Sequence, residues 1–134
     1  MKPVILCFET MPGYERSGGA RTTPLVKGDH GAMNFMNGVT ELPPGGMIPL
    51  HQHDCEESVI VLKGSAIAEI DGTSYTLDVC DTVWIPPGIP HRFINASSSN
   101  HMLIFWTYGS INASRTLVTT GETRRVSDEH GNRQ

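Results

Sequence analysis

Residues 51–64 read HQHDCEESVIVLKG, and this stretch decides how the rest of the chain is interpreted. On a strand, residues two apart point to the same face, so His51 and His53 share a face. Glu57 has the same parity and joins them if the strand continues without a bulge, whereas Glu56 points away. Two imidazoles and a carboxylate on one face can chelate a divalent transition metal. The alternative is an exposed strand that carries its histidines by chance.

A second stretch, PPGIPHRFIN at 86–95, favours the metal site. Its Pro-Pro-Gly turn delivers His91 onto a new strand, where it would complete a set of three histidines and one carboxylate. Nitrogen and oxygen ligands of this kind suit iron, manganese, nickel, copper or zinc. The pattern does not choose among these metals.

The two stretches together resemble the motifs of the cupin superfamily. Residues 45–64 match the first motif: Gly, five residues, His-x-His, three residues, Glu, six residues, Gly. Residues 80–95 match the second motif, except that Cys80 stands where a glycine is usual. That glycine would serve backbone freedom at a turn, so Cys80 bears on the shape of the turn more than on metal binding. Asn95, the last residue of the motif, is expected to anchor a loop.

The resemblance implies a small single-domain cupin of the RmlC-like type. Its fold would be all-β: a double-stranded β-helix, or jelly-roll barrel, in one domain over 1–134 with a core barrel at about 30–120. It implies one divalent metal per chain, with Fe, Mn or Ni favoured and Zn or Cu as alternatives. The ligands carried over from the motifs are His51, His53, Glu57 and His91.

The flanking sequence agrees with a β-rich fold. Glycine (14) and proline (9) are frequent, turn signals recur from 37 to 121, and no window shows sustained helical periodicity. The stretch 33–42 reads as one strand, or as two strands joined at Asn37-Gly38. Residues 1–24 look irregular, with at most a short edge strand near 4–8. The tail 122–134 is polar and is predicted to be frayed, or a short helix at most.

Four side chains near the motifs are candidates for the pocket wall. Phe93 shares the face of His91, and Trp106 and Tyr108 share a parity that Phe105 does not. The alternative for these aromatics is ordinary core packing or a buried dimer interface. Cys55 shares the parity of His53 and Glu57, as a soft extra ligand or, the favoured interpretation, a small filler in the turn.

Charge and cysteine content exclude some classes of protein. The net charge is −4 with no long basic run, which argues against nucleic acid as a partner. No apolar run is long enough to span a membrane. The three cysteines lack zinc-finger spacing and there is no signal-peptide pattern, so reduced thiols in a cytoplasmic protein are expected.

The resemblance indicates the chemistry only broadly, because one cupin barrel hosts many activities. The expected function is a metal-dependent enzyme acting on a small oxygenated or anionic organic substrate; its catalytic residues beyond the ligands are not identified. Dioxygenase chemistry is slightly favoured over an isomerase or a lyase or decarboxylase, because the candidate side chains around the site are apolar and aromatic and there is no obvious general base. A sugar-phosphate isomerase would also need more inward lysine or arginine than can be placed. The alternative is a non-catalytic small-molecule or metal sensor. A homodimer is the expected assembly.

Overall fold

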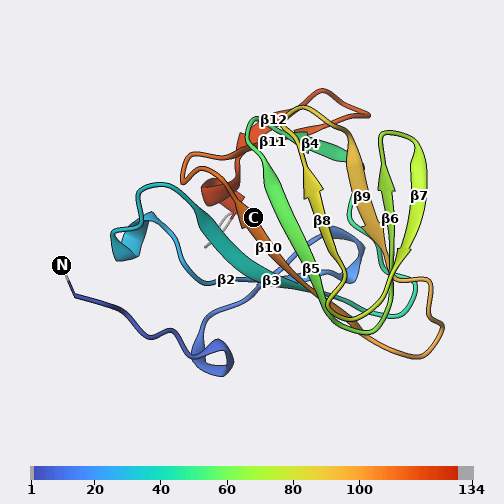
Figure 1. Ribbon diagram of the computed structural model, residues 1–134, viewed down its shortest axis with the longest axis horizontal. Helices are drawn as coiled ribbons and strands as arrows, with labels where there is room; N and C mark the ends of the chain where they lie inside the picture. Colours follow the sequence, from blue (N-terminus) through green and yellow to red (C-terminus); the bar gives the residue numbers. More distant parts are fainter. Residues whose placement is uncertain (1, 130–134) are drawn as a thin grey trace.

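Two antiparallel six-stranded sheets face each other in the computed structural model, which describes residues 2–129 (Figure 1). Their inner faces enclose the hydrophobic core, which includes Val59, Val61, Phe93 and Ile104. This arrangement is the all-β jelly-roll barrel that the sequence predicts. Among residues 2–129, no helix is long and apolar enough to cross a membrane.

The first sheet has the strand order β1-β2-β3-β10-β5-β8. Its strands are β1 (Tyr14–Glu15), β2 (Arg21–Pro24), β3 (Met36–Leu42), β10 (Met102–Tyr108), β5 (Glu57–Lys63) and β8 (Thr82–Ile85). The long central strand β10 alternates strictly, with Met102, Ile104, Trp106 and Tyr108 buried and the residues between them half-buried. Trp106 and Tyr108 therefore face the interior, and Phe105 takes the other face.

The second sheet has the strand order β12-β11-β4-β9-β6-β7. Its strands are β12 (Thr123–Arg125), β11 (Ser114–Leu117), β4 (His51–His53), β9 (His91–Ile94), β6 (Ala66–Ile70) and β7 (Thr73–Leu77). Short 3-10 turns lie outside the sheets at η1 (Phe8–Thr10), η2 (Ser17–Gly19), η3 (Gly28–His30) and η4 (Val126–Glu129).

The stretch containing Asn37-Gly38 is one strand rather than a hairpin. Gly38 pairs with Trp106 in the β3–β10 register. A Cβ at Gly38 would lie 2.5 Å from Trp106 Cζ2 and 2.6 Å from the Thr23 carbonyl oxygen. Here glycine allows a close approach of backbone and indole, and it does not make a turn.

Both ends of the chain are more ordered than the sequence suggests. Residues near 4–8 form no strand and lead into η1, but β1 and β2 extend the first sheet through pairing with β3. At the other end, β12 pairs with β11, and Val126 is 1% exposed with its N–H bonded to the Ala113 carbonyl. Strand pairing, the buried Val126 and the contacts of Glu129 with Arg16 and Arg115 hold this polar segment on the barrel. Residues 130–134 of the predicted tail lie outside the described residues.

Cys80 has φ +75°, a left-handed conformation that costs a non-glycine residue about 1–2 kcal/mol. Its backbone N–H bonds the Val61 carbonyl, which holds the chain in this turn. Cys80 therefore adopts, at this motif position, the left-handed backbone conformation that glycine usually provides.

Replacing Cys80 with glycine should raise the free energy of unfolding by about 0.5–1 kcal/mol, because strain is relieved at the cost of a more flexible unfolded chain. Urea denaturation under reducing conditions measures the change. Cys7 is also exposed but has φ −90°, so Cys7→Gly is the matched control and should not stabilise. A Cys80→Gly variant less stable than the wild type would contradict this account.

Asn95 is buried, and its side chain joins the loop that follows β9 to the end of β3. Its amide nitrogen lies 2.8–3.1 Å from the carbonyl oxygens of Leu42, Pro43 and Asn100, and its Oδ1 accepts from the Ser97 N–H. The expected role as a loop anchor is confirmed by these contacts.

Asn95→Ala should therefore destabilise the fold by about 2–3 kcal/mol, since several buried backbone carbonyls lose their donor. The change should appear as a lower midpoint of urea denaturation. Asn112→Ala, at an exposed position bonded to Arg125, should cost well under 1 kcal/mol. Equal losses in the two variants would show that Asn95 has no special anchoring role.

Candidate metal centre

Four buried side chains from both sheets meet inside the barrel. His51 and His53 lie on β4 and His91 on β9 of the second sheet, where His51 and His91 are direct cross-strand partners. Glu57 opens β5 of the first sheet. One potential ligand atom from each side chain lies within 4.8 Å of the others. The structure thus brings together the four residues expected to bind a metal.

Glu57 reaches the site by a different route from the one that strand parity suggests. The strand β4 ends at His53, the chain turns at 54–56, and Glu57 begins a strand of the opposite sheet. Shared parity on one continuous strand is therefore the wrong reason for its position. Glu56 is exposed and accepts a hydrogen bond from Trp84 Nε1 at 2.8 Å.

Each histidine ring is oriented by a backbone carbonyl that faces its Nδ1. The carbonyls belong to Pro49, Ser114 and Ile89, at 2.7, 2.9 and 2.8 Å from Nδ1 of His51, His53 and His91 respectively. A carbonyl only accepts, so each neutral ring donates its proton at Nδ1 and keeps a lone pair at Nε2. This is the tautomer and second partner found in metal-binding histidines.

The Nε2 atoms surround the Glu57 carboxylate. Glu57 Oε1 lies 3.0 Å from His91 Nε2 and 3.5 Å from His53 Nε2. Within the described part of the chain, His53 Nε2 is buried without a hydrogen-bond partner. Lone pairs and a carboxylate facing one another in a dry interior repel unless a cation lies among them. This donor set fits a divalent transition metal.

Burial keeps two of the imidazoles neutral. It lowers the pKa of His51 well below its usual value, with a further contribution from the positive charge of Arg115. Burial also lowers the pKa of His53 to about 4, although the nearby Glu57 acts in the opposite direction. Neutral imidazoles are ready to bind a metal near pH 7 without first losing a proton.

A cavity of about 260 Å³ opens near the site, and a separate void of about 20 Å³ touches His51 and Glu57. Both spaces share five lining residues: Arg16, Thr22, Thr40, Ile48 and Arg115. The outer cavity and the inner void are therefore neighbours, with these side chains between them.

Three of the four pocket candidates line the inner void: Phe93, Trp106 and Tyr108. The Tyr108 ring lies 4.5 Å from that of His53 and stacks on Trp106 at 4.9 Å. Cys55 lines neither cavity and is half-buried against the core. Burial raises the pKa of its thiol to about 11, so it stays protonated and fills space.

Sequence reasoning missed the arginines of the cavity wall. Arg115 lies opposite His53 in the β11–β4 register and is hydrogen-bonded to Tyr108. Arg16 precedes η2 and enters the cavity from the N-terminal segment. Only the cross-strand register would have placed Arg115 beside a ligand, and the sequence does not reveal which strands pair.

Comparisons with known proteins agree with the fold and the site. The family model described as "Cupin domain" matches residues 38–108. Protein SchB of Streptomyces halstedii is 30% identical over 102 residues, which cover 75% of this chain and 74% of SchB. Polyketide synthase CurC of Streptomyces cyaneus is 31% identical over 109 residues, which cover 78% of this chain and 69% of CurC. This chain belongs to the cupin family.

A solved structure extends the likeness of fold to nearly the whole chain. The polyketide cyclase RemF from Streptomyces resistomycificus has a TM-score of 0.72 with this structure at 21% identity. The match covers 94% of this chain and 85% of RemF. The shared fold therefore extends beyond residues 38–108, which the family model matches.

Replacing His53 with alanine should remove most of the bound metal, because Nε2 is one of the four converging ligand atoms. Elemental analysis of untagged protein, purified without added metal, measures this. His101→Ala is the control, since His101 is half exposed and pairs with Glu41 on the surface. Full metal stoichiometry in His53→Ala would refute the ligand assignment.

Proposed function

We propose that the protein is a metal-dependent enzyme that binds a small, enolisable oxygenated organic compound, or its anion, in the cavity ending at the four-residue cluster. The observation that carries this proposal is the cavity that adjoins a void touching the buried side chains of His51 and Glu57. A closed structural site would have no use for such a cavity beside its ligands.

The ligand set supports a divalent metal held by His51, His53, Glu57 and His91. Iron, manganese or nickel are the favoured metals, with zinc or copper as alternatives. When bound, such a metal supplies a Lewis acid that polarises a carbonyl oxygen.

The surrounding side chains support binding of a polar, partly anionic substrate. Burial raises the pKa of Tyr108, so its phenol stays protonated and can donate a hydrogen bond into the void. Arg115 adds a positive charge on the same wall, while Ile48 and Phe93 supply apolar surface that excludes water. Hydrogen bonds and charge act strongly in such a dry site.

These features favour carbonyl and enolate chemistry over the dioxygenase chemistry preferred from the sequence. That preference depended on an apolar, aromatic surround and the lack of an obvious general base, whereas Arg16 and Arg115 add cationic side chains to the cavity wall. The names of two similar proteins, polyketide synthase CurC and polyketide cyclase RemF, support the same preference, since polyketides are chains of enolisable carbonyls. Dioxygenase activity is kept as the alternative, and the homodimer and the cytoplasmic location stay predictions.

Metal-loaded protein should accelerate the exchange of the acidic C–H proton of ethyl 2-methylacetoacetate in D2O, measured by NMR. His51→Ala should lose the acceleration, and His101→Ala should retain it. An oxygen electrode run in parallel distinguishes the alternatives, because enolisation consumes no dioxygen. Dioxygen uptake without faster exchange would overturn the proposal in favour of a dioxygenase. The absence of both signals would favour the sensor.

A further inference from the structure

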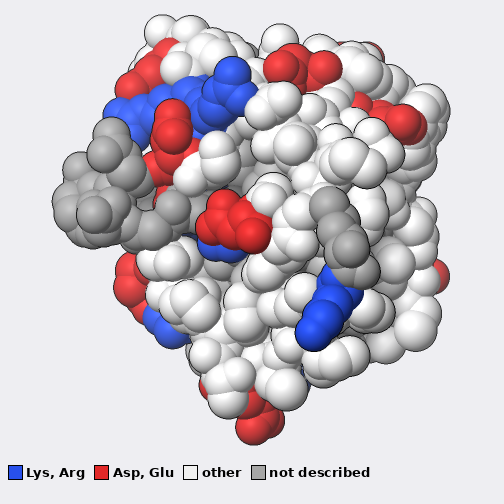
Figure 2. All heavy atoms as spheres, turned by 90° about the vertical axis from the view of Figure 1, so that its left-hand side faces the viewer, with Lys and Arg blue, Asp and Glu red and all other residues white. Residues whose placement is uncertain are grey.

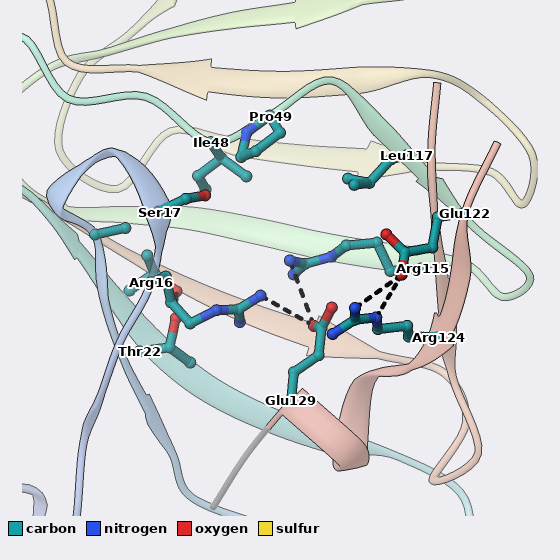
Figure 3. Close-up of a pocket in the computed structure, with 12 residues that line it drawn as sticks. Arg16, Ser17, Thr22, Ile48, Pro49, Arg115, Leu117, Glu122, Arg124 and Glu129 are labelled. Atoms are coloured by element: carbon teal, nitrogen blue, oxygen red, sulfur yellow. Dashed lines mark hydrogen bonds and ion pairs between the residues drawn. The ribbon is translucent and has the colours of Figure 1, made fainter. Parts of the chain in front are cut away.

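Two arginines and one glutamate from distant segments meet at the mouth of the cavity. Arg16 Nη2 and Arg115 Nη1 lie 3.2 and 3.4 Å from the same oxygen, Oε1 of Glu129, and both guanidiniums point toward it (Figure 3). The three side chains are only 21%, 13% and 12% exposed, in that order. This cluster lines the outer cavity, and Arg16 and Arg115 also line the inner void that touches His51 and Glu57.

The geometry of the cluster is loose for an ion pair. Charge-assisted N–H···O bonds are usually about 2.7–2.9 Å long, and arginine prefers to grip both oxygens of a carboxylate. Here both cations contact a single oxygen at longer range. Among residues 2–129, Arg115 Nε and Glu129 Oε1 are buried without a hydrogen-bond partner. One donor that a carboxylate could use in a bidentate grip, Nε of Arg115, is therefore unused.

The cluster also carries an excess of positive charge. Two guanidiniums share one carboxylate, and the other arginine of the cavity wall, Arg124, is already paired with Glu122 at 2.8 Å. Burial, followed by the charge of Arg115, lowers the pKa of Arg16, as expected for two cations held close together. Figure 2 shows acidic and basic side chains scattered over one face of the molecule, without a large patch of one sign. A second negative group would balance the cluster.

The segment that carries Glu129 is anchored to the barrel at Val126, three residues earlier in the chain. Val126 is buried and bonded to Ala113, whereas Glu129 ends the short turn η4. Release of the carboxylate from the arginines would therefore not require the Val126 anchor to move.

We propose that Arg16 and Arg115 form a carboxylate-binding subsite, which Glu129 occupies as an internal counter-ion until the carboxylate of a ligand displaces it. The proposal deepens the proposed function and rests on it for one point: the other end of the ligand would reach the metal centre. The substrate class is then an oxygenated organic acid, with its carboxylate at the mouth and its carbonyl at the inner end.

Benzoate binding to metal-free protein tests the subsite without depending on the metal chemistry. Calorimetry at constant ionic strength compares benzoate with benzamide, a neutral compound of the same shape. Glu129→Gln should bind benzoate about tenfold more tightly than the wild type, because the competing carboxylate is gone. Benzoate should also raise the melting temperature of this variant more than that of the wild type.

Two further variants locate the effect. Adding Arg16→Gln to Glu129→Gln should abolish the gain, whereas adding Arg125→Gln should keep it, since Arg125 is exposed and lies outside the cavity. If Glu129→Gln does not fold, Glu129→Asp shortens the side chain and should still bind about threefold more tightly than the wild type. Equal affinity of the wild type and the folded variant, equal binding of benzamide, or a gain that survives Arg16→Gln would each overturn the proposal.

Discussion

The metal centre depends on the packing of one sheet against the other. Three histidines come from the second sheet and Glu57 from the first, so the ligand atoms converge only when the two inner faces are held at their packed distance. Core side chains such as Val59 and Phe93, both at most 2% exposed, set that distance. The ligand geometry therefore depends on the packing of the core. Metal binding should be coupled to the free energy of unfolding of the whole barrel.

The cavity changes in character from its inner end to its mouth. Near the ligands the wall is aromatic and apolar, and the imidazoles of His51 and His53 are neutral. Thr22, Thr40 and two arginines line both spaces, and three further charged side chains, Glu122, Arg124 and Glu129, line only the outer cavity. A ligand entering the cavity would meet fixed charge first and a dry interior afterwards. This order suits a substrate with an acidic end and a less polar reacting end.

Sequence reasoning found the fold and the four clustered residues because the motif spacings record which positions meet inside this barrel. The parity argument alone would have failed, since the turn at 54–56 moves Glu57 to the other sheet. The arginine cluster was not predictable for a physical reason. Arg16 lies in a segment that looks irregular, and Glu129 in a polar tail. Their meeting with Arg115 depends on long-range strand order that no local pattern records.

The Nδ1 acceptors of the three histidines are all main-chain carbonyls, and this has an evolutionary consequence. A side-chain acceptor can be lost by a single substitution, but a carbonyl is present whatever residue occupies the position. The orientation of the rings is thus protected against mutation as long as the backbone keeps its path. The charged cluster at the mouth of the cavity, in contrast, consists of the side chains of Arg16, Arg115 and Glu129, which single substitutions can replace. Such a barrel can acquire new substrates while its inner chemistry stays the same.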